Sequence, residues 1–339
     1  MTFSFGRVLQ MHLFGESHGK YIGILVEGMP PGVRISEAKI AGELSRRKPS
    51  GIAGTGRKEK DEFEILSGIF RGKTTGAPIA VIIRNKDRHS ADYSGNEFLP
   101  RPGHADFTAM QKFQGFNDFR GGGIFSGRMT AALVVAGAIA RQIPEMKKIR
   151  VKVEIERIGK AAKADGKSRM MAEIAKARAG KDSVGGIIEC TISGLEAGIG
   201  EPFFDSIESV LSHAMFSIPA VKGIEFGAGF RAAEMPGSQN NDQIILKDGG
   251  IQTRTNNAGG ILGGISNGMP VVFRVAIKPV PSIALPQRTV DLKEMKEKEI
   301  FVRGRHDVCI VPRALPVVEN LAVFCIADLM MRGGFIGKN

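Results

Sequence analysis

The sequence predicts a mixed α/β (α+β) protein built from two related halves packed face to face. The chain has 339 residues, of which 42% are hydrophobic and 24% charged, as in soluble globular proteins with a sizeable core. Segments with strand periodicity are interspersed with capped apolar helices. The order strand, Gly-x-x-x-Gly turn and capped helix recurs, which predicts an internal duplication over about 1–145 and 186–331 within a single domain.

The first half is predicted to contain several strands, two helices and several polar loops. A helix is expected from Ser36, whose hydroxyl can cap its first turn, to about Arg47. A second helix, rich in small apolar residues, is expected from Thr130 to Arg141. Strands are predicted at 3–12, 21–27, 63–66, 69–70 and 78–84, a strand-joining loop at 15–19, a flexible loop at 49–56 and a mobile loop over the site at 85–96.

In the second half, the same signals predict alternating strands and helices. Strands are expected at 151–155 and 186–192, and helices at 168–179, 205–216 and 316–331. The Lys and Arg residues of 168–179 are read as a solvated face. Paired glycines at 259–260 and 263–264 indicate close approach of the backbone to another group. Two halves packed face to face would place their loops around a shared cleft.

A glycine-rich polar stretch in the middle of the chain is the strongest candidate for a site. Arg-Pro-Gly-His-Ala-Asp at 101–106 is followed by three glycines at 121–123 and then by the small-residue helix. Consecutive glycines can expose backbone N–H groups to an anion, and a helix directly after them adds its N-terminal donors. The alternative is a tight turn before a closely packed helix. We favour an anion-handling active site because cationic side chains surround the turn, namely Arg101, His104, Arg120 and Arg128.

The charge of the chain favours small anionic ligands over nucleic acid. A net charge of +12 predicts anionic partners. However, the sequence has no basic tract, no helix-turn-helix or zinc-finger pattern, no Trp and only two Tyr. Walker A and Rossmann motifs are also missing, which disfavours those nucleotide sites. Small phosphorylated ligands therefore fit best.

Cysteine usage and hydropathy predict a cytoplasmic protein that does not bind membranes. Three widely spaced cysteines, Cys190, Cys309 and Cys325, form neither a disulfide framework nor a metal-binding pattern, so structural thiols and no metal site are expected. The N-terminal residues do not resemble an export signal. No run reaches the roughly 18 unbroken apolar residues of a membrane span.

A series of short motifs is spread from residue 14 to beyond residue 310. They are FGESHG at 14–19, RRxP at 46–49, ILSG at 65–68 with TTG at 74–76, RPGHAD at 101–106, RGGG at 120–123, GSQ at 237–239, AGGILGGIS at 258–266, KPxPS at 278–282 and GRHD at 304–307. Together, and in this order, they resemble the chorismate synthase family. Chance does not readily reproduce so many spaced matches.

The resemblance implies a β-α-β sandwich of two similar halves, assembled as a homotetramer. It implies a lyase of the shikimate pathway that removes phosphate from 5-enolpyruvylshikimate 3-phosphate by 1,4-trans elimination to give chorismate. Reduced FMN is required although no net redox change occurs, and NADPH is a candidate for reducing the flavin. The flavin is expected to lend electron density to the substrate while phosphate leaves, and its N5 region then takes the departing proton.

The chemistry and the resemblance together give candidate roles. A departing phosphate needs cations and a proton donor, and a histidine can donate near neutral pH. His18, beside Ser17 and the Arg46–Arg47 pair, could supply both. By resemblance, His104 protonates the reduced flavin and Asp307 helps to relay the proton near it. The alternative for each is a buried, hydrogen-bonded structural residue.

The complete set of candidate residues follows the motifs. Candidate catalytic residues are His18, His104, Asp307, Ser17 and Ser126. Candidate substrate contacts are Arg46, Arg47, Arg57 and Arg128. Candidate cofactor contacts, carried over by resemblance or lying beside such positions, are Arg47, Ile124, Phe125, Ser126, Pro219, Ala220, Gly263, Lys278, Pro279, Val280, Pro281, Ser282 and Arg305. Lys278 and Arg305 are the expected charge partners for the flavin's phosphate and anionic ring.

Several positions depart from the family pattern. Ile124 and Phe125 stand where Arg-Ser is usual, Pro219 replaces an asparagine, Val308 replaces a proline, and an arginine expected near Ala53 is missing. These changes permit a second hypothesis, a flavin- and phosphate-binding relative that has lost catalysis. A third hypothesis, a basic nucleic-acid-binding protein, rests on net charge alone. The retained histidines, Asp307 and Arg47 favour the lyase.

Overall fold

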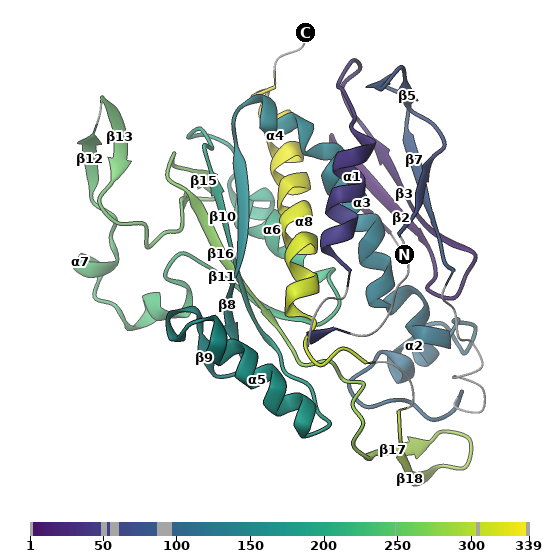
Figure 1. The fold of residues 1–339 in the computed structure, drawn as a ribbon. Coiled ribbons are helices and arrows are strands. Elements are labelled where there is room, and N and C mark those ends of the chain that lie inside the picture. The colour runs from purple at the N-terminus through teal and green to yellow at the C-terminus, as the bar shows by residue number, and fades with distance from the viewer. Residues whose placement is uncertain are drawn as a thin grey trace.

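Two five-stranded antiparallel sheets enclose a layer of helices (Figure 1). The computed structural model describes residues 3–48, 53–54, 61–86, 97–247, 249–302 and 306–336. Each sheet turns its apolar side toward the helices, and the buried residues form one continuous hydrophobic core. The fold is the β-α-β sandwich expected from the sequence; the internal duplication remains a prediction.

The first sheet has the order β1-β2-β3-β7-β4. Its strands are β1 (Ser4–Phe5), β2 (Gln10–Gly15), β3 (Tyr21–Glu27), β7 (Ile79–Arg84) and β4 (Phe63–Ile65). Alternate residues of β7, namely Ile79, Val81 and Ile83, are buried, as the period of two in a strand requires. The expected strand at 3–12 is divided into β1 and β2, because Gly6 with a φ of 99° interrupts it.

The second sheet has the order β11-β16-β10-β8-β9. Its strands are β11 (Val221–Phe226), β16 (Val271–Ile277), β10 (Gly186–Ser193), β8 (Arg150–Ile158) and β9 (Ala161–Ala162). In β16 the strict alternation of buried residues places Val271, Phe273, Val275 and Ile277 in the core. The strand predictions at 151–155 and 186–192 are confirmed.

The helix layer contains α1 (Glu37–Arg46), α3 (Thr130–Ala140), α4 (Gln142–Met146), α6 (Ile207–Phe216) and α8 (Val311–Arg332). Ser36 caps α1 as predicted by accepting from the Lys39 N–H. All residues of α3 are buried, and α3 packs closely on α8. A Cβ on Gly137 would lie 2.2 Å from the Asn320 backbone oxygen, so only glycine permits this helix contact.

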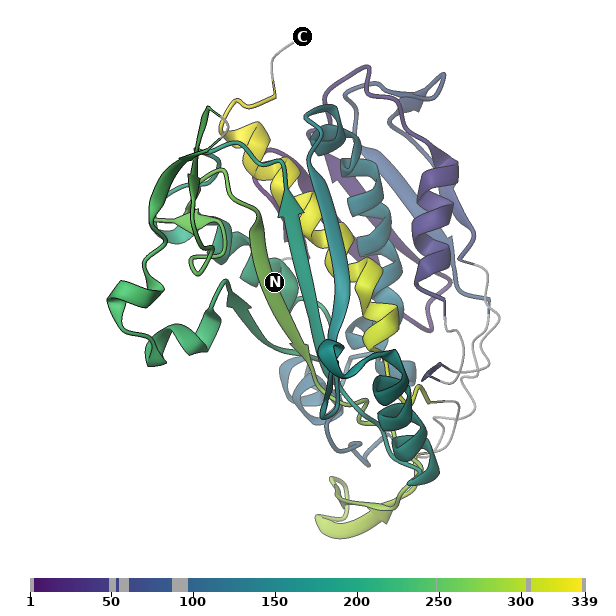
Figure 2. The same cartoon turned by 60° about the vertical axis from the view of Figure 1, so that its left-hand side comes forward.

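Helix α8 is long and apolar enough to cross a membrane, but 89% of its most apolar window is buried inside the fold. It is the central core helix (Figure 2). The prediction that it begins at Pro316 was wrong, since it starts at Val311 with Pro316 inside. Pro316 has no N–H, so the helix lacks one backbone hydrogen bond, the one to the carbonyl four residues earlier in the first turn of α8.

Three polar residues of α8 are buried and partnered. The Asp328 carboxylate accepts from the backbone N–H groups of Arg7, Val8 and Leu9 and pairs with Arg332. Glu319 pairs with Arg46 and Arg141, and Asn320 donates to Glu43. These contacts attach the last helix to the N-terminal segment and to α1.

The remaining elements lie outside the sandwich. They are α2 (Asp106–Lys112), α5 (Lys167–Ala179), α7 (Gly237–Asn240) and the strand pairs β5 (Ile69–Phe70) with β6 (Lys73–Thr74), β12 (Ile244–Lys247) with β13 (Gly250–Thr253), β14 (Ile261–Leu262) with β15 (Ile265–Ser266), and β17 (Gln287–Asp291) with β18 (Lys296–Ile300). The β12–β13 and β17–β18 hairpins project from the body (Figures 1 and 2). All three cysteines are buried free thiols, as expected. The loop predictions at 49–56 and 85–96 fall largely outside the described residues.

Candidate functional site

A cavity of about 670 Å³ lies where loops next to both five-stranded sheets meet the ends of the central helices. Arg47 at the end of α1, Thr130 at the start of α3 and Ile310 just before α8 all line it. This volume is in the range of small-molecule sites. The candidate residues that line it are His18, Arg47, His104, Ile124, Phe125, Ser126, Arg128, Pro219, Ala220, Lys278, Val280, Pro281, Ser282 and Asp307.

Four candidate residues do not line the cavity. Ser17 donates to the Arg120 carbonyl, and Arg46, which is partly exposed, pairs with Glu43 and buried Glu319. Pro279 lies between lining residues in the sequence, and Gly263 is in the β14–β15 turn. The direct substrate contact expected of Arg46 and the direct cofactor contact expected of Gly263 therefore have no support from this cavity. Arg57 and Arg305 lie outside the described residues.

The glycine turn holds the loop that carries His18. Residues Gly121, Gly122 and Gly123 all have positive φ, as expected. Ser17 Oγ donates to the Arg120 and Gly121 carbonyls, each at 3.3 Å, and its N–H donates to the Gly123 carbonyl. A Cβ at Gly121 would lie 2.4 Å from His18 Nε2, so the absent side chain gives room to the imidazole.

The turn does not open directly into a helix, which corrects that part of the prediction. The glycines lie inside one short 3-10 turn, Arg120–Phe125, and a second, Gly127–Met129, comes between them and α3. Ser126 Oγ accepts from the Arg128 N–H at the start of the second turn. The glycine N–H groups and the donors at the start of α3 are therefore separate features of the cavity.

His104 is neutral at pH 7 in this arrangement. Its Nε2 lies 2.7 Å from Ser282 Oγ. Burial and the nearby Arg101 guanidinium lower the pKa of His104 to about 4, and Lys278 acts in the same direction. Asp106 opposes this shift, but its carboxylate is held by Arg101 through the backbone N–H and the side chain.

This lowered pKa predicts an acid-sensitive fold. The unfolded chain binds a proton at His104 near pH 6.5, whereas the folded chain binds it only near pH 4. Stability should therefore be lost as pH falls between these values. Chemical denaturation of the parent and of His104→Gln from pH 7 to pH 4 should give a flatter profile for the variant. Parallel profiles would contradict the shift.

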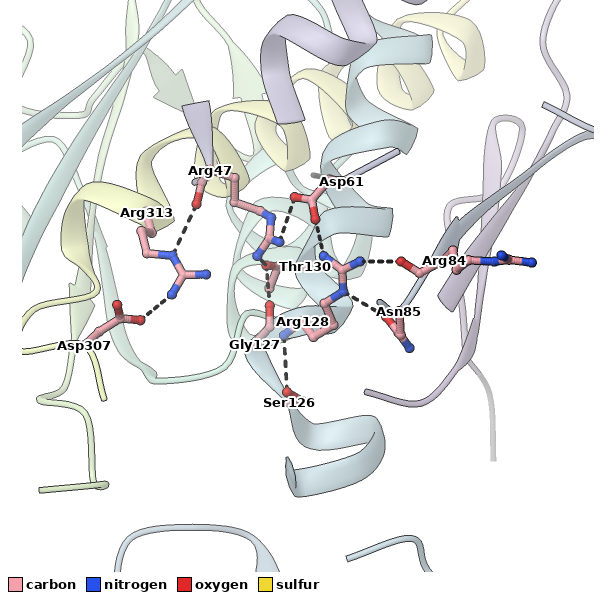
Figure 3. A network of polar contacts seen from close by, with 10 residues as sticks. All are labelled: Arg47, Asp61, Arg84, Asn85, Ser126, Gly127, Arg128, Thr130, Asp307 and Arg313. Atoms are coloured by element: carbon pink, nitrogen blue, oxygen red, sulfur yellow. Dashed lines mark hydrogen bonds and ion pairs between the residues drawn. The ribbon is translucent and has the colours of Figure 1, made fainter. Parts of the chain in front are cut away.

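One carboxylate joins two cavity arginines (Figure 3). Asp61 Oδ2 accepts from Arg47 Nη2 at 3.0 Å, and Asp61 Oδ1 accepts from Arg128 Nη1. Burial alone would raise the pKa of Asp61, but the two guanidinium groups outweigh it and hold the pKa below its ordinary value. We call Arg47, Asp61 and Arg128 the arginine clamp. Asp61 was missed from sequence because its charged surroundings, residues 57–64, resemble solvated surface.

A second ion pair lies beside the clamp. Arg313 Nη1 donates to Asp307, and Arg313 Nε donates to the Arg47 carbonyl at 3.2 Å. Arg313 therefore connects the candidate proton-relay residue to the end of α1. Sequence reasoning also missed Arg313, although its position in the first turn of α8, six residues after Asp307, is a signal that the two residues lie close together.

The cavity has a basic side and an apolar wall. The wall includes Phe125, whose ring lies 6.3 Å from that of Phe113. Ala220 has a φ of 75°, an unfavourable value for a residue with a Cβ, and such strain is often found at functional sites. A planar aromatic ring with a phosphate tail fits this combination. Among the described residues, no group of three or more His, Cys, Asp or Glu could hold a metal ion.

Comparisons with known proteins agree on one family. The family model described as Chorismate synthase matches residues 9–331. Chorismate synthase of Pyrococcus abyssi is 51% identical, with 96% of this chain and 97% of that protein covered. That of Thermococcus kodakarensis is 48% identical with the same coverage. A solved structure titled Crystal Structure of Chorismate Synthase has a TM-score of 0.73 and 29% identity, covering 96% of this chain and 93% of that one.

Proposed function

The chain belongs to the chorismate synthase family, and from this premise we propose that it eliminates phosphate from 5-enolpyruvylshikimate 3-phosphate to form chorismate. The reaction is a 1,4-trans elimination by a carbon–oxygen lyase of aromatic amino-acid biosynthesis. A C–O bond to phosphate and a C–H bond break, and a second ring double bond forms. The observation that carries the proposal is one cavity that gathers His18, His104, Asp307 and Arg47.

The basic side of the cavity fits the leaving phosphate. Arg47 supplies positive charge, and His18 stands beside the glycine turn, where it can protonate a departing oxygen. Developing negative charge on phosphate is stabilised most by cations already held in place. Buried Asp61 keeps the clamp ordered before substrate arrives.

His104 can take up a proton when an anion enters. Its pKa is lowered by burial and by cations, and a nearby negative ligand would offset the cations and move the pKa toward neutrality. Ser282 fixes the imidazole through its hydroxyl. Arg313 holds the Asp307 carboxylate at the same cavity. We assign His104 to proton transfer toward the cofactor and Asp307 to the proton relay.

Reduced FMN is the proposed cofactor. When bound, it would supply electron density to the substrate and accept the departing proton. The residues that would hold it are Ile124, Phe125, Ser126, Pro219, Ala220, Lys278, Val280, Pro281 and Ser282, all on the cavity wall. Lys278 Nζ donates a hydrogen bond to the Gly103 carbonyl at 2.7 Å. We propose that it is a charge partner for the phosphate or the anionic ring of the flavin. NADPH is proposed as the reductant, with Arg47 and Arg57 as contacts.

We also propose a homotetramer in the cytoplasm. Apolar side chains on the projecting β12–β13 hairpin support burial against another copy: Ile244, Leu246 and Ile251 are 73%, 80% and 76% exposed. Sedimentation velocity of the parent and of the double variant Leu246→Lys with Ile251→Lys tests this.

The Ile124→Arg variant should bind FMN more tightly than the parent. An arginine is usual at this position of the family, and a charge-assisted hydrogen bond contributes about 1.5–3 kcal/mol, or roughly 10- to 150-fold in affinity. The gain should shrink at high salt because the new contact is ionic. FMN titration and melting of both proteins measure it. Unchanged or weaker binding with a lower melting temperature would mean that Ile124 belongs to a closed apolar wall.

The direct test is anaerobic incubation with 5-enolpyruvylshikimate 3-phosphate and chemically reduced FMN. Phosphate and chorismate should appear in equal amounts, and neither should appear with oxidised flavin. Binding of substrate and reduced flavin without phosphate release would instead support a relative that has lost catalysis.

A further inference from the structure

The two arginines of the clamp differ in how much of their hydrogen-bonding capacity is used. Arg128 donates from Nε to Asn85 Oδ1 at 2.9 Å, from Nη1 to Asp61, and from Nη2 to the Arg84 carbonyl at 3.2 Å. All three of its nitrogens therefore have protein partners. Figure 3 shows Arg128 between Asp61 and the end of β7.

Arg47 has fewer partners. Its Nη2 donates to Asp61 at 3.0 Å and its Nη1 reaches Thr130 Oγ1 only at 3.5 Å. Its Nε is buried without a hydrogen-bond partner in the described part of the chain. A buried unpartnered donor is unfavourable unless another group satisfies it, and a charged one favours an anionic oxygen. Arg47 is thus the clamp member with donors left for a ligand.

The support for Asp61 continues beyond the clamp. Asn85, which accepts from Arg128, donates from Nδ2 to the Glu16 and Gly19 carbonyls on either side of His18. The same chain of contacts therefore connects Asp61, through Arg128 and Asn85, to the loop that carries His18. Side chains of Asp61 and both arginines are at most 6% exposed, so water screens these contacts weakly.

We propose that Asp61 is a positioning residue that holds the Arg47 guanidinium ready for the phosphoryl group of the substrate, while Arg128 anchors Asp61 and does not contact that group. This inference rests on the proposed function. It assigns different roles to Arg47 and Arg128, both of which the sequence analysis named as candidate substrate contacts. Asp61 also cancels one of the two positive charges, so the clamp of the parent protein should bind inorganic phosphate only weakly.

The test compares phosphate binding with turnover. Asp61→Asn removes the negative charge that competes with phosphate for Arg47, while Arg128 keeps its bonds to Asn85 and to the Arg84 carbonyl. Inorganic phosphate, measured by calorimetry, should bind about 3-fold or more tightly, while turnover per folded molecule falls about 10-fold or more. A residue that only supports the fold would alter neither quantity per folded molecule. Both values within twofold of the parent, or weaker phosphate binding, would overturn the proposal.

Two arginine variants keep the proposal testable if Asp61→Asn does not fold. Arg47→Lys keeps the charge but removes the planar donors, and it should weaken phosphate binding about 10-fold. Arg128→Lys should lower the melting temperature and change phosphate binding less than about 3-fold. Equal weakening by both variants would refute the division of roles. Because phosphate binding is measured without turnover, this result is independent of whether the elimination itself is observed.

Glu62→Gln is the matched control. Glu62 is the next residue along the chain, undergoes the same change from carboxylate to amide, and pairs at the surface with Lys86. Exposed ion pairs contribute little to stability, so Glu62→Gln should keep phosphate binding and turnover within about twofold of the parent. If this control behaves like Asp61→Asn, the effect belongs to general charge rather than to the clamp, and the proposal fails.

Discussion

Replacing either His18 or His104 with alanine should lower turnover by about 100-fold or more, because removal of a positioned general acid has effects of this size. Both imidazoles line the cavity, His18 beside the glycine turn and His104 on the Ser282 hydroxyl. Turnover is measured with saturating substrate and reduced FMN, and circular dichroism checks that each variant is folded.

His12→Ala is the control for these two variants. The His12 imidazole pairs with Glu27 at 2.9 Å within the first sheet and does not line the cavity. Replacing His12 removes a partly exposed contact with Glu27, and such a contact contributes little to stability. If His18→Ala or His104→Ala retains full turnover, that histidine is a structural residue, and the proposed proton transfer must be assigned elsewhere.

Replacing Gly121 with alanine should be nearly as damaging as losing His18. The new methyl group would lie 2.4 Å from His18 Nε2, so the imidazole must move by about 1 Å to restore van der Waals contact. A displacement of this size from the reactive geometry can reduce turnover about 100-fold. The measurement is turnover together with the melting temperature, because Gly121 with a φ of 59° also adds some backbone strain.

Gly122→Ala separates the two effects. Gly122 has a φ of 81°, at least as unfavourable for alanine, yet a Cβ there meets nothing within 4 Å. This variant should show similar loss of stability but keep turnover within about 10-fold of the parent. Equal loss of turnover in both variants would show that backbone strain, and not the contact with His18, is responsible.

Local signals in the sequence were enough to predict much of the architecture. Ser36 as a cap, the alternating pattern near Val151 and the small-residue run from Thr130 each predicted an observed element. The start of α8 was predicted too late because a proline was taken as a helix boundary. Helix α8 tolerates Pro316 because the surrounding core contributes far more than one backbone bond.

The site was predicted where motifs carry it and missed where only folding brings residues together. His18, His104 and Asp307 belong to recognisable motifs, and all three line the cavity. Asp61 has no local signal, because its partner Arg128 lies 67 positions away. Arg313 lies only six residues from Asp307, but its contact with the Arg47 carbonyl at the end of α1 arises from the fold. Ion pairs of this kind depend on tertiary contacts, which periodicity and composition do not encode.

The buried carboxylate of Asp328 has a consequence for biosynthesis. It accepts from backbone N–H groups 319 to 321 positions earlier in the chain, in the loop between β1 and β2. The ribosome makes those residues about 320 positions before Asp328, so the first sheet and α3 emerge while the surface that α8 covers is still exposed. Until α8 emerges, the nascent chain must therefore remain incompletely folded and exposed to aggregation or chaperone binding. Contacts between segments so far apart in the sequence also predict slow folding once α8 is available.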